Sequence, residues 1–238
     1  MRTVGIIGFG SFGKFLVDKL RDHQFIIKVH DPVAKVPKKY STELTKIAVC
    51  DYLVLAIPID SYKPVLEVLA PLLKKSTIVI DIASVKTTPV QILDKYIPGQ
   101  KRVIMHPLFG PQSADKSFWG HVVVMCPNVS DKQAYIEAKE FVVKLGLAVV
   151  EKTPEEHDKE MAYAQGLTFF LARTLLSVGI HDVGLITPSF KKLLDLAELE
   201  SHHSEELFRT IQTGNPYLAE IRSQFISTAK MINDQLEK

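Results

Sequence analysis

The stretch Val4-Gly5-Ile6-Ile7-Gly8-Phe9-Gly10-Ser11-Phe12-Gly13 decides the fold of this chain. Its apolar first part is typical of a buried strand, and the glycines that follow form a Gly-x-Gly-x-x-Gly turn. Apolar residues at 12, 16 and 20 then recur at helical spacing, and a second apolar run over 25–30 ends at Asp31. Strand, glycine turn, helix, strand and acidic residue within about thirty positions predict a dinucleotide-binding βαβ unit.

Each glycine of this turn has a distinct task in such a unit. Gly8 allows the tight turn, Gly10 lets the backbone approach a pyrophosphate, and Gly13 lets the helix pack against the strand. The helix N-terminus supplies N–H groups and a partial positive charge to the phosphates. The alternative is a tight turn in an α/β protein that binds no nucleotide. The residues expected to contact the cofactor are Gly8, Phe9, Gly10, Ser11, Phe12, Gly13, Asp31, Ile57 and Pro58.

Asp31 also bears on which cofactor is bound. A carboxylate at the end of the second strand accepts hydrogen bonds from an adenosine ribose and repels a 2′-phosphate, which favours NAD over NADP. Three lysines, at 35, 38 and 39, follow closely and soften that preference. We therefore expect NAD, with NADP as the alternative.

The pattern after Asp31 extends the unit into a larger sheet. Apolar runs at 52–57, 77–81 and 102–105 predict further strands, and residues 64–73 have helical spacing. Near-continuous apolar strands that alternate with amphipathic helices indicate a Rossmann-like, doubly wound, mostly parallel sheet. Runs at 121–125 and 147–150 predict late strands, interpreted as antiparallel edge pieces. Ile57, Pro58, Ser84 and His106 fall just after predicted strands, where such sheets bind ligands.

From Thr153 the strand pattern gives way to helices. Thr153-Pro154-Glu155-Glu156 is typical of a helix start, and the predicted helix runs to about Gly179. Its apolar stripe is expected to include Met161, Ala164, Thr168, Leu171 and Leu175. Further helices are predicted over 190–200, over 205–213 and after Gly214-Asn215-Pro216. We expect a dinucleotide-binding domain over 1–151 and an all-helical substrate and dimerisation domain over 152–238, with the chain forming a homodimer.

Composition narrows the classes of function. The 238 residues are 46% hydrophobic and 24% charged with a net charge of +2, which makes no electrostatic case for nucleic acid. No apolar run reaches the roughly 20 residues needed to span a bilayer, and we expect no membrane partner. The two cysteines, Cys50 and Cys126, are far apart and predict buried thiols. We expect a cytoplasmic protein without a signal peptide and without a metal site.

The residues just after the predicted strands suggest a reaction. An enzyme that passes hydride from an alcohol to a nicotinamide needs a base for the hydroxyl proton, and histidine is mostly neutral at about pH 7. His106, after a strand and before a Gly-Pro loop, is the best placed histidine, with a structural role as the alternative. Ser84 either hydrogen-bonds the same hydroxyl or caps the helix that follows it.

Several motifs together resemble the prephenate/arogenate dehydrogenase family. The matching stretches are the glycine turn, Asp81-Ile82-Ala83-Ser84-Val85-Lys86, His106-Pro107-Leu108-Phe109-Gly110-Pro111, Glu156-His157-Asp158, Gln165-Gly166-Leu167-Thr168 and Asn215-Pro216-Tyr217-Leu218. The resemblance implies NAD(P)-dependent oxidative decarboxylation of prephenate or arogenate to 4-hydroxyphenylpyruvate or tyrosine, in tyrosine biosynthesis. It places the catalytic histidine at His106 and the hydroxyl-binding serine at Ser84.

The sequence departs from the family pattern at two positions. Many members carry a histidine shortly after the Gln-x-Leu-x run, where this chain has Phe169. The arginine that binds a substrate carboxylate in the family falls on Thr210, with Arg209 one residue away. Since an unpaired carboxylate is costly to bury, some cation must serve. Arg209 is the first candidate, with Arg173, Arg222 or a partner subunit's arginine behind it, and Gln165 and Thr168 are the other expected substrate contacts.

Two other functions remain open on the residues alone. One is a different Rossmann-fold hydroxyacid oxidoreductase, although such enzymes use a lysine on a helix where this chain points to His106. The other is a nucleotide-sensing relative without turnover, which Phe169 and the displaced Arg209 make conceivable. The substrate is left open among prephenate, arogenate and an amino-substituted analogue.

Overall fold

A computed structural model describes residues 1–114, 117–127 and 131–237 of the chain. It divides into two compact units, Met1–Glu155 and Glu156–Lys238. The first is built around a β-sheet and is called the sheet unit below, and the second is the helical unit.

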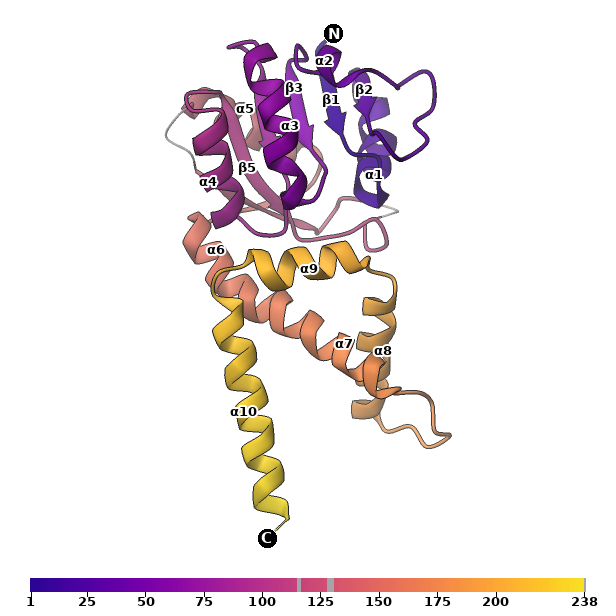
Figure 1. Cartoon of the computed structure of the whole chain (residues 1–238). Coiled ribbons are helices and arrows are strands. Elements are labelled where there is room, and N and C mark those ends of the chain that lie inside the picture. The colour runs from indigo at the N-terminus through magenta and orange to yellow at the C-terminus, as the bar shows by residue number, and fades with distance from the viewer. Residues whose placement is uncertain (115–116, 128–130, 238) are drawn as a thin grey trace. The chain divides into compact units, whose positions relative to one another are not determined.

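The sheet unit contains a seven-stranded sheet in the order β2-β1-β3-β4-β5-β6-β7 (Figure 1). All neighbouring strands are parallel except β5 and β6, which pair antiparallel. The predicted mostly parallel sheet is thus confirmed. The strands are β1 (Thr3–Ile7), β2 (Ile26–His30), β3 (Tyr52–Leu55), β4 (Ile78–Asp81), β5 (Arg102–Pro107), β6 (Val122–Cys126) and β7 (Ala148–Glu151).

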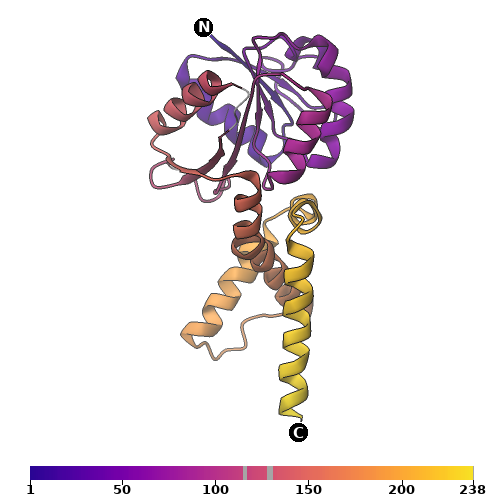
Figure 2. The ribbon, with the colours of Figure 1, turned by 90° about the vertical axis from the view of Figure 1, so that its left-hand side faces the viewer.

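Helices cover both faces of this sheet, as Figure 2 shows. One core forms where α2, α3 and α4 pack on the apolar strands, with Leu53, Leu66 and Leu93 fully buried. Two further cores occupy the other face, one against α1 and one against α5. The helices are α1 (Ser11–Leu20), α2 (Leu44–Ile47), α3 (Tyr62–Leu69), α4 (Thr87–Tyr96) and α5 (Lys132–Lys144), with 3₁₀ turns at Arg21–His23, Ile59–Ser61 and Ala70–Leu72.

Two details of the predicted strands are wrong, the end of β3 and the end of β5. β3 ends at Leu55 rather than at 57, because the chain turns there to pack on Gly8. β5 continues through His106 to Pro107, because the antiparallel partner β6 pairs with these last residues. The two late strands do run antiparallel to the rest of the sheet, as predicted: β6 pairs antiparallel with β5, and β7 pairs parallel with β6, because α5 carries the chain back between them.

The helical unit consists of one long helical segment followed by three helices, in agreement with the predicted pattern. The long segment changes to a π-helix in its middle. Its parts are α6 (Pro154–Met161), the π-helix η4 (Ala162–Leu167) and α7 (Thr168–Val178), and they are followed by α8 (Pro188–Ser201), α9 (Glu205–Gly214) and α10 (Leu218–Leu236).

The π-helix changes which side chains are buried. The predicted stripe is wrong at Ala164, which is exposed, whereas Ala162, Gly166 and Ala172 are the buried residues of η4 and α7. An i→i+5 turn accommodates an extra residue and rotates the side chains that precede it relative to regular 3.6-residue spacing. Gly166 is needed there because a Cβ at this position would lie 2.6 Å from the side chain of Leu218 on α10.

Candidate active site

The glycine turn after β1 has the geometry of a phosphate-binding loop. Gly8 has a φ of +101°, and a Cβ on it would lie 2.2 Å from the carbonyl oxygen of Ala56. A Cβ on Gly13 would lie 2.1 Å from the oxygen of Gly8, so that α1 can approach the strand only with glycine there. A Cβ on Gly10 would meet nothing within 4 Å, and the backbone at Gly10 therefore borders open space.

The first turn of α1 adds donors to this open space. The helix starts at Ser11, its N-cap is Gly10, and no side chain caps it. The N–H groups at the start of an uncapped helix need outside acceptors, and with the helix dipole they favour an anion. The residues of the turn therefore fit the diphosphate of a dinucleotide.

Asp31 follows β2 and faces the same turn. Its carboxylate accepts hydrogen bonds from the backbone N–H groups of Phe9 at 2.6 Å, Val33 at 2.8 Å and Ala34 at 2.7 Å. Burial works to raise the pKa of Asp31, but these backbone donors outweigh it and the pKa lies below its usual value. Since an ionised carboxylate has about four acceptor positions, one remains for the predicted ribose contact.

Ile57 and Pro58 follow the end of β3, as predicted. A Cβ on Gly8 would lie 2.9 Å from the Ile57 side chain, so the two residues pack together. Pro58 is half-buried and precedes the 3₁₀ turn at Ile59–Ser61. Both residues therefore lie next to the glycine turn.

A buried ion pair holds the turn that carries Ser84. The Asp81 carboxylate and the Lys86 ammonium are both fully buried and in contact. The same carboxylate accepts hydrogen bonds from the Tyr62 hydroxyl at 2.6 Å and from the backbone N–H of Ala83 at 3.1 Å. Burial, and then the charge of Asp81, raise the pKa of Tyr62 well above its usual value, which keeps this hydroxyl a donor.

Lys86 also ties this turn to the strand of His106. Its ammonium donates to the carbonyl oxygen of Met105 at 2.7 Å. Because β4 and β5 are parallel neighbours, with Asp81 opposite Ile104, the residues after β4 and the end of β5 lie at one edge of the sheet. Lys86 thus links the Ser84 turn to the backbone just before His106, a link that the sequence analysis did not predict.

Ser84 and His106 differ in how closely they are enclosed. Ser84 is half-buried, and α4 begins after Lys86 without a side-chain cap, so the alternative that Ser84 caps this helix is wrong. His106 lies within β5, opposite Val124 of β6, and is 4% exposed. Its position inside the strand, rather than after it, fixes the backbone that carries the imidazole.

In the helical unit, the expected substrate residues lie around the π-helix. The side-chain oxygen of Gln165 is buried and has no hydrogen-bond partner among the described residues. The hydroxyl of Thr168 donates to the carbonyl oxygen of Tyr163 at 3.5 Å. Phe169, which replaces the family's histidine, stacks on the ring of His203 with centroids 4.7 Å apart, and His203 contacts the buried Glu200. An imidazole thus adjoins position 169 although the residue there is phenylalanine.

The three arginines considered for binding a substrate carboxylate differ in the groups that they contact. Arg173 contacts Glu200 and Glu205, so its charge is already compensated. Arg222 donates to the backbone oxygen of Gln212 at 2.7 Å and thereby caps the end of α9. Arg209 is exposed, and no carboxylate pairs with it in the described part of the chain. Arg222 likewise has no carboxylate partner there, so Arg209 is the one of the three whose guanidinium has neither a carboxylate nor a backbone acceptor among the described residues.

Two further family motifs meet inside the helical unit. The ring of His157 and the carboxylate of Asp158 are 2.8 Å apart and almost fully buried. The Asn215 amide donates to the backbone oxygen of Asp158 at 2.7 Å. This arrangement ties the start of α6 to the Asn-Pro turn before α10 and gives these residues a structural role.

Within residues 1–114, 117–127 and 131–237, no three His, Cys, Asp or Glu side chains gather as they would around a metal ion. Over the same residues, no helix has the length and apolar composition required to cross a bilayer.

The glycine turn, the uncapped helix start and the acidic residue after β2 together define a nucleotide-binding α/β protein. Residues 21–151, more than half of the chain, match the sequence profile of the prephenate dehydrogenase nucleotide-binding domain. The chain belongs to the prephenate dehydrogenase family.

Named relatives agree with this placement. A probable arogenate/prephenate dehydrogenase of Methanocaldococcus jannaschii is 28% identical over 98% of this chain and 56% of its own length. Arogenate dehydrogenase 2 of Arabidopsis thaliana is 30% identical over 90% of this chain and 64% of its own length. The chain therefore spans somewhat more than half of the length of these relatives.

Solved structures show the same fold. The prephenate dehydrogenase of Aquifex aeolicus, in complex with hydroxyphenyl propionate and NAD+, has a TM-score of 0.78 at 21% identity and covers 99% of this chain and 91% of its own. The arogenate dehydrogenase of Synechocystis has a TM-score of 0.70 at 21% identity and covers 98% and 93%. The predicted fold, a doubly wound sheet followed by helices, is confirmed.

Proposed function

We propose that this chain catalyses the oxidative decarboxylation of prephenate or arogenate, to 4-hydroxyphenylpyruvate or tyrosine, with NAD as the preferred cofactor and NADP as the alternative. The observation that carries the proposal is the link from the Ser84 turn through Lys86 to the strand of His106, at the ligand-binding edge of the sheet. The family and the named relatives support it. In this role the chain serves tyrosine biosynthesis.

When bound, the nicotinamide cofactor supplies the acceptor for hydride. Backbone groups from Gly8 to Gly13 and the N-terminus of α1 hold its diphosphate, Asp31 binds its ribose, and Ile57 and Pro58 border it. Asp31 favours a free 2′-hydroxyl, because its carboxylate is ionised and repels a 2′-phosphate.

The protein's own contribution to the chemistry is to orient the substrate and accept a proton. Ser84 hydrogen-bonds the ring hydroxyl, and the His106 imidazole takes the hydroxyl proton as the C–H electrons leave with hydride. Loss of carbon dioxide returns the pair of electrons of the broken C–C bond to the ring, which becomes aromatic. Burial of His106 excludes water from this proton transfer.

We assign substrate recognition to residues of the helical unit. Arg209 pairs with a substrate carboxylate, since its charge lacks a protein partner in the described structure. The buried, unpartnered oxygen of Gln165 accepts a hydrogen bond, and Thr168 lies one helical turn beyond it. An oxygen acceptor such as that of Gln165 suits an ammonium group. Because arogenate carries an ammonium group and prephenate does not, Gln165 favours the binding of arogenate over that of prephenate.

The test is the growth of absorbance at 340 nm, with NAD+ or NADP+ and with each of prephenate and arogenate. The proposal predicts turnover of at least one substrate, faster with NAD+ than with NADP+, and equimolar release of carbon dioxide. Cofactor binding without turnover of either substrate would contradict it and favour a nucleotide sensor. NADH formation without carbon dioxide release from another hydroxyacid would favour a different oxidoreductase.

We also propose a homodimer formed through the helical unit. Four large apolar side chains on α10 are at least half exposed, namely Ile226, Met231, Ile232 and Leu236. Large apolar side chains exposed along a helix in this way are typical of a surface covered by a second subunit. Light scattering after size-exclusion chromatography tests this, with Ile232→Asp expected to yield monomers and the exposed Val143→Asp on α5 as control.

A further inference from the structure

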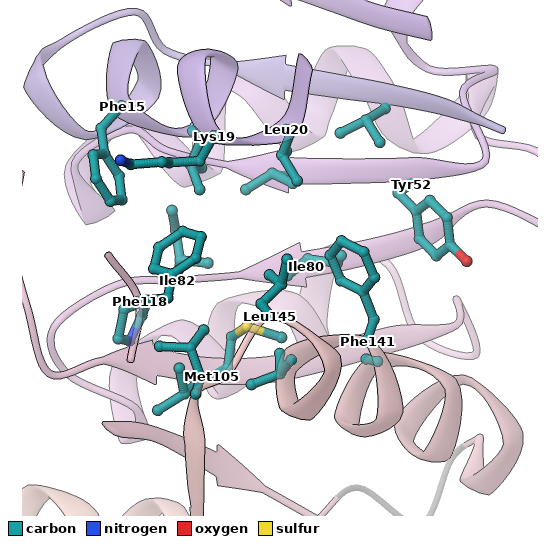
Figure 3. A pocket seen from close by; sticks show the side chains of 18 of the residues that line it. Phe15, Lys19, Leu20, Tyr52, Ile80, Ile82, Met105, Phe118, Phe141 and Leu145 are labelled. Atoms are coloured by element: carbon teal, nitrogen blue, oxygen red, sulfur yellow. The ribbon is translucent and has the colours of Figure 1, made fainter. Parts of the chain in front are cut away.

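A cavity of about 230 Å³ lies inside the sheet unit, and neither Ser84 nor His106 lines it (Figure 3). It occupies the face of the sheet that carries α1 and α5. Ile80 and Met105 of the central strands line it on one side, and Leu20 of α1 and Leu145, the residue just after α5, line it on the others. The cavity is therefore a space between two helices over the middle of the sheet.

The cavity lies where it does because α1 and α5 pack on separate parts of the same sheet face. α1 packs on one core, with Val17 against Ile6 and Val29 of β1 and β2. α5 packs on a second core, with Val142 against Val123 of β6. The strands β3 and β4 lie between these cores, and neither helix covers their apolar side chains completely. A sheet face of this kind needs a covering group.

Aromatic rings bridge the gap at its two ends. At one end Phe15 of α1 meets Phe118 edge to face, with centroids 5.8 Å apart and planes at 88°. At the other end Phe25 meets Phe141 of α5 at 5.5 Å and 81°. Figure 3 shows Phe15 and Phe118 at one side of the cavity and Phe141 at the other. The cavity is the unfilled space between these two aromatic contacts.

The charged side chains that line the cavity belong to its ends. The Lys19 ammonium lies 5.5 Å from the Phe15 ring centroid. Arg2 lies 5.5 Å from the Tyr52 ring centroid and pairs with Glu137 at 3.1 Å. The other described lining residues are apolar. Such a lining offers no partner to an ammonium or carboxylate in the middle, so an amino acid does not fit there.

The size and lining indicate the class of ligand. An apolar cavity of about 150 Å³ stays dry and accepts benzene. A space of about 230 Å³ therefore accommodates a substituted benzene or a bicyclic ring such as indole. We propose that this cavity is a binding site for a neutral aromatic ring compound, held by edge-to-face contacts with the phenylalanines at its ends.

The same lining connects the cavity to the candidate active site. Phe12 belongs to the glycine turn, Ile82 precedes Ser84 by two residues, and Met105 and Pro107 flank His106. A ring that fills the cavity restrains α1 against β4 and β5. Because coupling between two sites is reciprocal, the occupied cavity changes the affinity for the dinucleotide, and the dinucleotide changes the affinity for the ring. This inference goes beyond the proposed reaction and does not depend on it.

The experiment uses the full chain with indole and 4-methylphenol as probes. Calorimetry is expected to show saturable binding of one molecule per chain, and the melting temperature to rise by about 2–4 °C at saturation. Ala138→Phe on α5 places a ring inside the cavity and should weaken probe binding at least about tenfold. Ile136→Phe, on the same helix at a position 47% exposed, is the matched control and should bind as the parent does.

If Ala138→Phe fails to fold, methyl NMR of the unsubstituted chain still shows whether a probe binds in the cavity. Indole should shift the methyl signals of Met105 and Leu145, which line the cavity, and not that of Met231, which is 53% exposed on α10. Absence of saturable binding up to the solubility of both probes, or equal binding by Ala138→Phe, would overturn the site. An NAD+ dissociation constant unchanged by saturating indole would overturn the coupling. Neither result would contradict the proposed reaction, which the 340 nm assay with prephenate and arogenate tests separately.

Discussion

The buried polar groups at the Ser84 turn and the polar groups around the π-helix differ in how many hydrogen-bond or ionic partners they have within the protein. In the sheet unit the buried Asp81 carboxylate contacts Tyr62, Lys86 and a backbone N–H. In the helical unit the buried oxygen of Gln165 lacks a partner and Arg209 lacks a carboxylate, among the residues described. The difference teaches that the buried groups of the Ser84 turn are held by partners within the protein, whereas Gln165 and Arg209 are left with groups that a ligand could bind.

The largest expected effect is the loss of the buried ion pair. Lys86→Met leaves the Asp81 carboxylate buried without its counterion, which should cost about 3–5 kcal/mol in the free energy of unfolding. Urea denaturation measures it. Lys46→Met, which removes an exposed pair with Glu43, should change stability by less than about 1 kcal/mol. Equal effects of the two substitutions would show that the buried network does not stabilise the sheet unit.

Gly166→Ala tests the packing of the π-helix. The added methyl would lie 2.6 Å from Leu218, and overpacking of this kind should destabilise the protein by about 1–3 kcal/mol. Gly166→Ala combined with Leu218→Val should be more stable than the sum of the two single changes, because the smaller side chain relieves the contact. Additive effects in thermal unfolding would mean that Leu218 is not what requires glycine at this position.

Arg209→Met tests the group assigned to the substrate. Loss of one charge-assisted contact should raise KM for the substrate about 10- to 50-fold and leave the melting temperature unchanged. Arg21→Met, also at an exposed arginine, is the control and should leave KM unaffected. If Arg222→Met raises KM while Arg209→Met does not, the substrate cation is Arg222 and its capping of α9 is incidental.

The smallest expected effect concerns Asp31. Because its folded-state pKa lies below the usual value, the carboxylate is ionised throughout pH 5–9. The preference for NAD over NADP should therefore be constant over pH 7–9, where the 2′-phosphate of NADP is also fully ionised. The stability that Asp31 contributes should be lost only as pH falls below about 4. Asp31→Ser should improve the kcat/KM ratio of NADP to NAD by about tenfold. A preference that disappears between pH 7 and 9 would show that another group sets it.

Local patterns were sufficient to predict the sheet, the glycine turn and the helix positions, because periodicity and turn residues act over short distances. They did not predict the extension of β5 through His106, which depends on pairing with β6. Nor did they predict the role of Lys86, although a lysine directly after a buried strand and turn is a signal of a buried pair. The π-helix was missed for a related reason, since its extra residue is stabilised by contacts with α9 and α10, such as the bond from Gln212 to Gly166.

Single-turnover formation of NADH by His106→Gln, with substrate and NAD+ saturating, tests the central claim most directly. If the imidazole accepts the hydroxyl proton, the rate should fall by about 10²- to 10⁴-fold while the dissociation constant of NAD+ stays the same. A rate within about twofold of the parent would contradict the assignment of the proton to His106.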